Sequence, residues 1–531
     1  MRGLLARYER LRGVEPSQEG EEFWDLVVIS AGDPSQQSWY EAQLELKHQS
    51  GDLPLVPYHI IPDPPGPRIG SGGSTLHILA QLSRQFGARL DEWRILLIHA
   101  GGFSKRLPSH SCSGKIFSPL PVMTGRGGPY QMLDLKLALY LPFLAVMQPG
   151  VFVTASDDIE VFNLDTERLE GGRGETITAL AHPSSLYIGT THGVYVMKDL
   201  QLSQESLQDV QPCLEVLQKP SVDLMRERGA VVRLAGDDME QEEEIVYSDS
   251  AFWFHSATSR KLLGLSRDLG KLEVEMCIYG DLLTCLGERE DKDYLTRLYQ
   301  EEDHTRRGVE VKRKIAETVG DTDLAILTLH QSKFYHLGTT QEYLHGLTND
   351  RFLRLELNLE NIVCSQIRED PSNLIQGIVL NSVIEQAASI PSDSIVEYSA
   401  IRSQISLGAK TILSNVEVKE KQDIPEGFLY HTVAIQLEGC RKFVTVAFHV
   451  TDDMKFSTEV ARSDNLQYGG KLLEKLFSLS PQLYTKQSVF SSAASASLWT
   501  ARLFSAQSSM AESFRETVRM VASLCNQVGN K

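Results

Sequence analysis

Short apolar runs alternate with segments of helical spacing through the first part of the chain, from about residue 24 to about residue 290. The runs are rich in Val, Ile, Leu and Phe, and their length is typical of buried strands. They lie at residues 25–30, 58–61, 95–98, 151–154, 176–180, 193–196, 214–217 and 251–254. Helices are predicted at residues 37–47 and 76–86. Because alternating strands and helices are typical of a parallel sheet covered by helices, the pattern predicts an α/β domain with a mixed, mostly parallel sheet.

The hydrophobic pattern changes after about residue 374, where aliphatic residues recur every six positions. This register contains Ile395, Ile401, Leu407 and Leu413. A second register, which contains Ile378, Ile384 and Ile390, slips near Pro391. One inward aliphatic residue in every six is typical of a parallel β-helix, whose coils stack these residues on one another. We therefore expect a β-helix-like domain, with an ordinary β-sandwich as the alternative.

The last segment of the chain, from about Ser488 to Cys525, has few helix breakers and is rich in Ala, Ser, Leu and Met. The spacing of Leu498, Leu503 and Met510 predicts a helical segment that caps the preceding domain. The pattern thus divides the chain into four parts. They are an N-terminal helix (1–23), an α/β domain (24–345), a β-helix-like domain (346–485) and a C-terminal helical segment (486–531).

The composition narrows the classes of protein to which the chain can belong. A formal net charge of -18 argues against a general binder of nucleic acid or membrane surfaces, because both need basic faces. The seven cysteines are scattered and form no Cys-x-x-Cys pair, which suits a reducing compartment. The most apolar stretch, residues 135–147, contains Lys136 and Pro142 and is too short to span a bilayer. We expect a soluble cytoplasmic protein, and any phosphate site must be a local basic pocket.

The clearest candidate for chemistry is a glycine-led basic loop after the strand predicted at residues 95–98. It runs from His99 to Pro108 and is followed by Gly114 and Lys115. Small residues at the end of a strand can leave backbone N–H groups bare, and the cations of Lys105, Arg106 and Lys115 can neutralise a polyphosphate. The loop therefore points to nucleotide chemistry.

Two common kinase signatures are missing around this loop. A Walker A sequence needs a glycine where Ser109 stands and a hydroxyl residue where Ile116 stands. The run Gly264–Asp268 does not supply the Gly-Leu-x-Ser-Ser-Ala loop of galactokinase-type enzymes. A P-loop NTPase and a galactokinase-type kinase are therefore not predicted.

The loop resembles the signature of the nucleotide-sugar pyrophosphorylases, Gly-Gly-x-Gly-[Thr/Ser]-Arg-Leu followed by Pro-Lys. Over most of the chain the sequence is similar to one branch of them, the fucose-1-phosphate guanylyltransferases, part of whose sequence is shared with the non-kinase region of fucokinases. The segments that carry this resemblance are Asp63–Gly66, Gly70–Thr75, Ala100–Pro108, Gly114–Lys115 and Leu498–Phe504. Ser104, Lys105 and Gly114 depart from the general signature, and these departures favour the fucose branch.

The resemblance implies an activity and an architecture. Such an enzyme joins GTP and L-fucose 1-phosphate to give GDP-L-fucose and pyrophosphate in the fucose salvage route. The implied architecture is a Rossmann-like nucleotidyltransferase domain followed by a left-handed β-helix, through which any homo-oligomer would form. Two other readings stay open. The chain could be a fucokinase-related sugar kinase fragment, or a non-catalytic subunit that senses nucleotide sugars.

The nucleotide end of the implied site consists of the two glycine-rich segments and the cations. Lys105 and Arg106 would hold the triphosphate tail, and Lys115 would contact the α-phosphate, because this chemistry is mostly positioning and neutralisation of anions. The residues predicted to bind the nucleotide through the loop are Gly101, Gly102 and Ser104. Those predicted to lie at the base are Gly72, Gly73 and Thr75, before a helix.

The implied cofactor is Mg²⁺, or Mn²⁺ in its place, which prefers carboxylate ligands. Asp157 is the first choice and Asp158 the second, because both follow the strand at residues 151–154. Asp281 is the candidate for a second carboxylate, in competition with Glu273 and Glu275.

The sugar phosphate needs a cation of its own. The run Glu215–Pro220 resembles the Glu-Lys-Pro sequence by which these enzymes contact the sugar 1-phosphate, with Gln218 in place of the glutamate. This resemblance assigns Lys219 to the sugar phosphate. His192 and Asp249 lie in loops beside predicted strands and are further candidates for contacts to the sugar hydroxyls.

Overall fold

The computed structural model describes residues 2–168, 176–198, 207–234, 243–288, 306–473, 485–490 and 495–526. The chain is α/β, with parallel sheets and a C-terminal helix. Its contacts divide it into two compact units. The first consists of Met1–Gly102 and Leu133–Tyr335, and the second of Phe103–Met132 and His336–Lys531. The domain limits predicted at residues 23, 345 and 485 stay predictions. None of the helices in the described part of the chain is long and apolar enough to cross a membrane.

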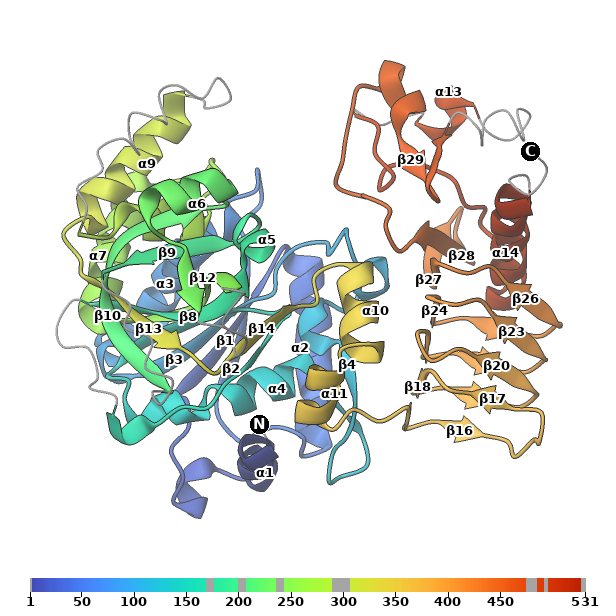
Figure 1. Cartoon of the computed structure of the whole chain (residues 1–531), viewed down its shortest axis with the longest axis horizontal. Coiled ribbons are helices and arrows are strands. Elements are labelled where there is room, and N and C mark those ends of the chain that lie inside the picture. The colour runs from blue at the N-terminus through green and yellow to red at the C-terminus, as the bar shows by residue number, and fades with distance from the viewer. Residues whose placement is uncertain are drawn as a thin grey trace. The chain divides into compact units, whose positions relative to one another are not determined.

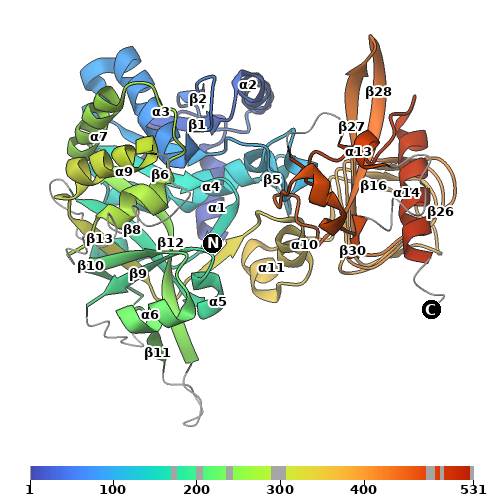
Figure 2. The same cartoon turned by 90° about the horizontal axis from the view of Figure 1, so that it is seen from above.

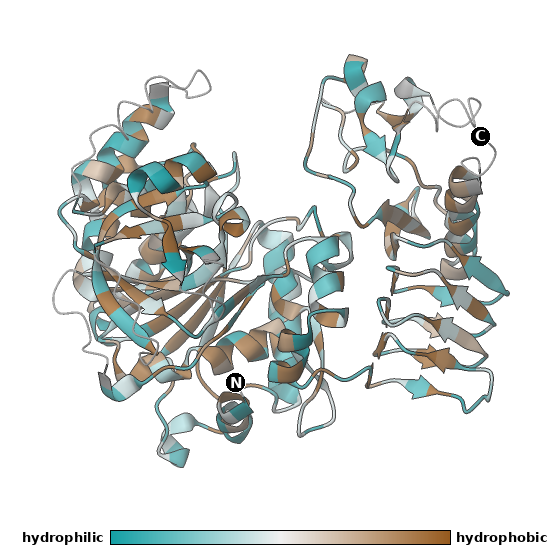
Figure 3. Ribbon diagram, in the orientation of Figure 1, coloured by the Kyte–Doolittle hydropathy of each residue, from teal (hydrophilic) through white to brown (hydrophobic). Residues whose placement is uncertain are grey.

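The first unit is built on one ten-stranded sheet, whose strand order is β2-β1-β3-β6-β12-β8-β13-β10-β9, with β11 paired to β12 (Figure 1). Its strands are β1 (Leu26–Ala31), β2 (Tyr58–Pro62), β3 (Arg94–His99), β6 (Gly150–Ala155), β8 (Ile177–Ser185), β9 (Gly193–Met197), β10 (Gln208–Gln218), β11 (Val232–Leu234), β12 (Glu243–His255) and β13 (Leu324–Leu329). β2, β1, β3 and β6 pair in parallel, as do β8 and β13, whereas β12 is antiparallel to β6, β8, β9 and β11, and β10 is antiparallel to β9 and β13. The sheet is mixed, but the expectation that it is mostly parallel is wrong. All eight predicted strands are confirmed, and apolar residues dominate them (Figure 3).

Helices cover both faces of this sheet because its strands are buried on both sides. The main ones are α1 (Arg2–Leu11), α2 (Pro34–Gln49), α3 (Gly70–Phe86), α4 (Met132–Leu139), α7 (Ser256–Leu269) and α9 (Arg306–Val319). Figure 2 shows α3, α7 and α9 together, and their apolar residues share one core cluster. On the other face the rings of Tyr140, Phe143, Phe152 and Trp253 pack together. The two helices predicted from spacing are parts of α2 and α3.

The second unit contains coils of three short strands, in which strands three places apart pair in parallel as far as β27 (Phe428–Leu437), whereas β28 (Cys440–His449) is antiparallel to β27 (Figure 1). The first sheet contains β15 (Ile362–Val363), β18 (Ile378–Leu380), β21 (Ile395–Glu397), β24 (Ile412–Ser414), β27 (Phe428–Leu437) and β28 (Cys440–His449). The second contains β16 (Gln366–Ile367), β19 (Val383–Ile384), β22 (Ala400–Ile401) and β25 (Glu417–Val418). The third contains β17 (Leu374–Ile375), β20 (Ala388–Ile390), β23 (Ile405–Leu407) and β26 (Gln422–Ile424).

Each coil repeats after 17 residues, because Val379 pairs with Val396 and Val396 with Leu413. The fixed six-residue period is therefore wrong. The core of the stack includes Val379, Ile384, Ile390, Val396, Ile401, Leu407, Leu413, Val418 and Ile424, at steps of five, six and six. Ile395 is buried but lies one residue outside this line. The two predicted registers are thus parts of one repeat. The apparent slip near Pro391 arises because the six-residue register contains Ile395 in place of the core residue Val396, whereas the short steps lie at residues 379–384, 396–401 and 413–418.

The short step coincides with a left-handed corner in every coil. Cys364, Asn381, Tyr398 and Asn415 have φ values of 49°, 48°, 49° and 52° and are spaced by 17 residues. A serine follows each of the first three corners. Its hydroxyl oxygen accepts the N–H of the equivalent residue one coil later: Ser382 N lies 3.1 Å from Ser365 Oγ, and Ser399 N lies 3.0 Å from Ser382 Oγ. This ladder satisfies backbone groups that the tight corner leaves without sheet partners.

The C-terminal helix α14 (Met510–Asn526) packs its apolar face, with Phe514, Val518 and Val521, against the coils. The helix predicted from about Ser488 is wrong over residues 495–509, although the short helix α13 (Lys486–Val489) precedes them. Leu498 and Leu503 are buried in residues 495–509, which contain no helix. Leu498 and Leu503 are apolar because this irregular segment buries them in a separate apolar cluster, and their spacing resembles that of a helix without reflecting one.

Residues 103–132 belong to the second unit because buried polar contacts tie them to it. The His110 ring lies 5.0 Å from that of Tyr343 in α10 (Thr340–Thr348), and the Tyr343 hydroxyl donates to Glu397 in the coils at 2.9 Å. Burial raises the pKa of Glu397, which favours a protonated carboxyl at this contact. The hairpin β4 (Pro119–Met123) and β5 (Pro129–Gln131) and the helix α11 (Arg351–Leu357) complete this region.

Candidate functional site

The backbone of the glycine-led loop is already hydrogen-bonded within the first unit. Ala100 N and Gly101 N donate to the hydroxyl oxygen of Ser30 at 3.0 and 3.2 Å. Gly102 N donates to Gln36 Oε1 at 3.2 Å, and Gln36 Nε2 donates to Gly102 O at 3.0 Å. The expectation of bare N–H groups at these three residues is therefore wrong in this structure. Protein oxygens occupy the donors, so Gly101 and Gly102 shape the loop.

Two residues of α2, one turn apart, hold this loop. Besides its contacts to Gly102, Gln36 accepts from Gly32 N at 2.7 Å. The buried Tyr40 donates its hydroxyl to Ala100 O at 2.9 Å. A side chain on Gly101 would lie 2.9 Å from the backbone of Ala31, so glycine is needed for the close approach. Sequence reasoning missed Gln36, because a lone glutamine on a helix carries no motif.

The cations of the loop belong to the second unit. Lys115 follows the loop in a short 3-10 helix (Lys115–Phe117), and its Nζ donates to Gly338 O at 2.9 Å. Arg106 O accepts from both the N–H and the hydroxyl of Thr340, at 2.9 and 3.1 Å. Lys105, Arg106 and Lys115 are half-buried. Their side chains sit on a segment anchored to the start of α10, with Ser104 at a left-handed φ of 45°.

The second glycine-rich segment is a packing site in the first unit. Gly72 N donates to Met276 O at 2.8 Å, and a side chain on Gly70 would lie 2.3 Å from that oxygen. Gly72, Gly73 and Thr75 are buried, and the Thr75 hydroxyl lies 2.9 Å from His99 Nε2. Burial lowers the pKa of His99 to about 4, so this imidazole is neutral at physiological pH. The structure thus gives these residues contacts with protein groups, and their role at the base stays a prediction.

Asp157 and Asp158 follow β6 at the end of a buried strand, as the pattern predicts. Asp157 is half-buried. Asp158 is buried and forms an ion pair of 2.6 Å with Lys136, which also donates to Tyr140 and Thr154 at 3.1 and 3.2 Å. Burial raises the pKa of Asp158 to about 6, although Lys136 acts in the opposite direction. The only sequence signal for Lys136 is a lysine within an apolar run.

A second buried carboxyl, that of Glu160, lies in β7 (Asp158–Val161). Neither of its oxygens has a hydrogen-bond partner among the described residues, and His182 Nε2 lies 3.9 Å away. His182 contacts the hydroxyls of Ser332 and Ser250 at 2.8 Å each. Burial lowers the pKa of His182 to about 3, so it is neutral at physiological pH. Asp158, Glu160 and His182 make this end of the sheet a polar interior that sequence reasoning did not foresee.

The predicted sugar residues lie together where the start of β9 and the end of β10 adjoin the middle of β12, so Asp249 lies within a strand and not in a loop as expected. Asp249 is buried and accepts the N–H of Gly193 at 3.0 Å, directly after His192. Lys219 is exposed, with a left-handed φ of 47°, and its N–H donates to His192 O at 3.1 Å. Burial raises the pKa of Asp249 to about 7, against the influence of the Gly193 N–H and of Lys219. The structure thus brings His192, Lys219 and Asp249 into one local cluster.

Asp281 has a different environment. It lies in a π-helix (Ile278–Leu282), where one carboxylate oxygen accepts the N–H of Cys277 at 2.6 Å and the other pairs with Lys312 at 3.1 Å. These contacts explain why the acid is buried there. To bind a metal ion, Asp281 would have to exchange them, and its metal role stays a prediction.

The described residues contain no group of three His, Cys, Asp or Glu side chains that could hold a metal ion by themselves. Lys136 engages Asp158 and Lys312 engages Asp281, and Asp157 is half-buried at the end of β6. Mg²⁺ is often bound through one or two carboxylates together with substrate phosphates, and the metal role of these three carboxylates stays a prediction.

The sequence matches the model of one protein family, described as the fucose pyrophosphorylase domain, over residues 87–509. The chain belongs to this family. The matched range contains the basic loop, Asp157, Lys219 and Asp249, whereas Gly72, Gly73 and Thr75 precede it.

Curated relatives extend the family match to nearly the whole chain. The human protein named fucose-1-phosphate guanylyltransferase is 35% identical over 545 residues, which cover 99% of this chain and 88% of that protein. The mouse protein of the same name is 35% identical and covers 98% of this chain and 90% of its own length. A bifunctional fucokinase/GDP-fucose pyrophosphorylase of Arabidopsis thaliana is 25% identical, and the alignment covers 91% of this chain but 46% of that protein.

Proposed function

We propose that the chain is a fucose-1-phosphate guanylyltransferase, which joins GTP and L-fucose 1-phosphate to give GDP-L-fucose and pyrophosphate in fucose salvage. The observation that carries the proposal is the 35% identity, over nearly the full length of both chains, to human and mouse proteins of that name. Two groups of side chains support this proposal. The cations of the loop can neutralise the triphosphate of GTP, and Lys219 can neutralise the phosphate of L-fucose 1-phosphate.

In this reaction a phosphate oxygen of the sugar phosphate attacks the α-phosphorus of GTP in line, and pyrophosphate leaves. The protein mainly positions and neutralises anions. Lys105 and Arg106 hold the triphosphate tail. Lys115 exchanges its contact with Gly338 O for an oxygen of the α-phosphate, where it stabilises the charge that develops in the transition state. Ser104, with Gly101 and Gly102, gives the loop the shape that presents these cations.

Lys219 is the cation for the sugar phosphate, because it is exposed beside the polar cluster of His192 and Asp249. Asp249 is buried and accepts one backbone N–H at 3.0 Å, which leaves it further acceptor capacity for a sugar hydroxyl. His192 directly precedes Gly193, the residue whose N–H donates to Asp249. We place the hydroxyls of fucose at this cluster.

The proposed cofactor is Mg²⁺, for which Mn²⁺ can substitute. Asp157 is its protein ligand, with phosphate oxygens of GTP completing the coordination. When bound, the ion screens the triphosphate and favours departure of pyrophosphate. Lys136 keeps Asp158 from turning outward, so that the acidic end of β6 has one defined shape.

The finer architecture and setting also belong to the proposal. We assign the first unit to the Rossmann-like nucleotidyltransferases and the coils to a left-handed β-helix, through which homo-oligomers would form. The chain would act in the cytoplasm. No Walker A or galactokinase-type loop accompanies the match to the plant bifunctional protein, so a kinase activity is not proposed.

A coupled assay separates the three candidate functions. The guanylyltransferase releases pyrophosphate only when GTP and L-fucose 1-phosphate are both present. A fucokinase fragment would instead form ADP from L-fucose and ATP. A sensing subunit would bind GDP-L-fucose and turn over neither pair. The proposal fails if pyrophosphate release does not depend on L-fucose 1-phosphate.

A further inference from the structure

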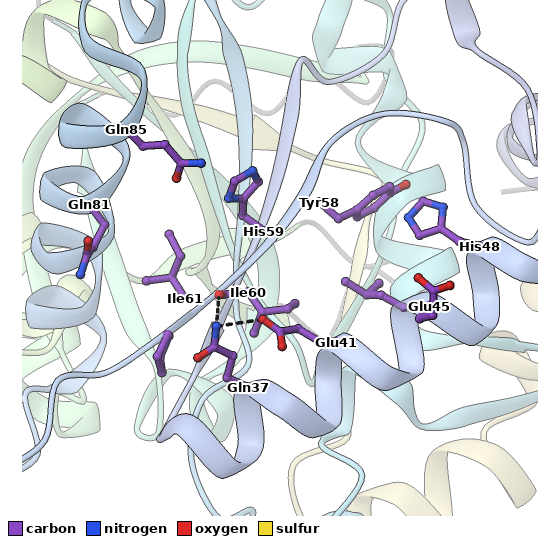
Figure 4. Close-up of a pocket in the computed structure, with 12 residues that line it drawn as sticks. Gln37, Glu41, Glu45, His48, Tyr58, His59, Ile60, Ile61, Gln81 and Gln85 are labelled. Carbon is purple, nitrogen blue, oxygen red and sulfur yellow. Dashed lines mark hydrogen bonds between the residues drawn. The ribbon is translucent and has the colours of Figure 1, made fainter.

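A polar pocket of about 520 Å³ lies at the free edge of the sheet in the first unit, between α2, β2 and α3 (Figure 4). β2 is the last strand of the sheet order and pairs only with β1. The polar side chains around the pocket are Gln37, Glu41, Glu45, His48, Tyr58, His59, Gln81 and Gln85. None of them belongs to the candidate catalytic site, so the pocket is a separate feature.

The charge of the lining disfavours an anionic ligand. Glu41 and Glu45 contribute two carboxylates, and no lysine or arginine is among the lining residues. These carboxylates would repel a phosphate or a nucleotide. Glu41 accepts from the Gln37 amide at 2.9 Å and Glu45 from the Gln49 amide at 2.8 Å. A neutral amide leaves each carboxylate further acceptor capacity, which suits the hydroxyls of a sugar.

The remaining groups suit an uncharged ring that carries several hydroxyls. The amides of Gln81 and Gln85 enter from α3 and provide donors and acceptors side by side. The ring of Tyr58 lies 5.3 Å from that of His48, and buried Ile60 lies on the same face of β2 as Tyr58, whereas buried Ile61 lies on the opposite face because side chains alternate along a strand. Apolar side chains with a few polar groups around them are typical of small-molecule sites. The volume exceeds that of one monosaccharide.

The pocket is linked to the loop through a single turn of α2. Gln37 donates to Ile60 O in the pocket wall at 3.2 Å, and its neighbour Gln36 holds Gly102 on the other side of the helix. One turn later, Tyr40 likewise holds the loop through Ala100 O, and its neighbour Glu41 lines the pocket. A ligand that fixes Gln37 and Glu41 therefore stiffens the same turn that holds Ala100 and Gly102.

We infer that this pocket binds an uncharged monosaccharide, and that its occupation restrains the loop at residues 100–102 through the first turns of α2. The site is regulatory, since it carries no group for the transfer chemistry. Sugar binding at this pocket can be measured without catalytic turnover.

The test measures binding by titration calorimetry, with L-fucose, D-mannose and D-glucose as separate probes. The full chain carries Lys219→Ala, so that contacts at the proposed catalytic sugar cluster are weakened. We expect at least one sugar to bind, and its affinity to fall at least tenfold in the Gln81→Ala/Gln85→Ala variant. Gln18→Ala is the matched control, because Gln18 is an exposed glutamine away from the pocket that contacts Glu15, and its affinity should not change.

Three results would overturn the inference. They are no binding of any of the three sugars, equal affinity in the Gln81→Ala/Gln85→Ala variant, or binding of spermidine or L-fucose 1-phosphate that Gln81 and Gln85 control. Hydrogen exchange tests the link to the loop. The amides of residues 100–102 should exchange at least twofold more slowly with the sugar bound, and Gln36→Ala should abolish this effect. Unchanged exchange would refute the coupling.

Discussion

Lys136 and Asp158 form a buried ion pair of 2.6 Å directly behind the acidic end of β6. Lys136 is fully buried, and Asp158 is nearly so. Two hydroxyls, those of Tyr140 and Thr154, accept the remaining protons of the ammonium group. Such a pair contributes little net stability when it is intact, because desolvation offsets the attraction. Its loss, however, leaves one charge buried without its counterion.

We therefore expect Lys136→Met to lower the free energy of unfolding by roughly 3–5 kcal/mol. Denaturant unfolding measures the effect. The double variant Lys136→Met/Asp158→Asn should recover more than half of it, since no buried charge is left unpaired. Lys261→Met is the control, because the pair Lys261–Asp321 is exposed on its acidic side and should contribute less than about 1 kcal/mol. A loss of less than about 1 kcal/mol in Lys136→Met would show that the pair is not buried as described.

Acid should destabilise the first unit through His182. Its pKa in the folded state is lowered from 6.5 to about 3, so the unfolded chain takes up a proton below pH 6.5 and the folded chain does not. The stabilising contribution is complete above pH 6.5 and is lost as the pH falls toward 3. Between pH 6.5 and pH 5 this one residue accounts for about 2 kcal/mol.

Denaturant unfolding at pH 7 and pH 5 tests this contribution. His182→Gln keeps a donor and an acceptor for Ser250 and Ser332 but cannot titrate. The difference in unfolding free energy between the two pH values should therefore shrink by about 2 kcal/mol in this variant. His345→Gln changes an exposed histidine and serves as the comparison. An equal pH dependence in wild type and His182→Gln would contradict the buried, neutral state of His182.

Because Gln36 is hydrogen-bonded to Gly102 in the loop, its loss should change the KM for GTP. Gln36→Ala removes three hydrogen bonds, to Gly32 and Gly102, each of which contributes about 1 kcal/mol. The loop then samples other shapes, and we expect the KM for GTP to rise about tenfold while the chain stays folded. Gln49→Ala, on the same helix but facing Glu45, should leave the KM unchanged. An unchanged KM in Gln36→Ala would mean that the shape of the loop does not limit GTP binding.

The left-handed corner of the coils predicts opposite effects for two substitutions at one position. Tyr398 has a φ of 49°, which is unfavourable for most residues but tolerated by asparagine, the residue at the equivalent positions 381 and 415. Tyr398→Asn should leave stability unchanged or raise it by about 1 kcal/mol. Tyr398→Val should lower it by roughly 1–2 kcal/mol, because a β-branched residue is strained there. Thermal unfolding distinguishes the two, and equal losses in both variants would rule out backbone strain as the cause.

Most strands of the first unit could be predicted because they are largely apolar and buried on both faces, as β1 and β6 are. The coils were harder, because their repeat contains steps of unequal length. A fixed period of six places Ile395 in the core, whereas the short step puts Val396 there. The corner that causes the step is occupied by Cys364, Asn381, Tyr398 and Asn415, which share a conformation and not a side-chain type. The serine that follows is the better sequence signal.

The site residues that could be predicted from the sequence are those that lie in a motif or beside a predicted strand. His192, Lys219 and Asp249 lie in separate segments of the sequence, and the structure brings them into one cluster because the start of β9 pairs with the end of β10 and with the middle of β12. Gln36 and Lys136 were missed, since each acts through contacts between segments far apart in the sequence. The grouping of residues 103–132 with the coils has the same origin, in contacts such as that between Tyr343 and Glu397.

In the proposed reaction the chain transfers the guanylyl group of GTP and not its terminal phosphate. GTP labelled with ³²P, in one sample at the α-phosphorus and in another at the γ-phosphorus, tests this directly in the presence of L-fucose 1-phosphate and Mg²⁺. We expect the α label to appear in GDP-L-fucose and the γ label in pyrophosphate. Lys115→Ala should slow the appearance of both labelled products by at least a hundredfold. Appearance of the γ label in a sugar phosphate, or wild-type rates in Lys115→Ala, would refute this reaction.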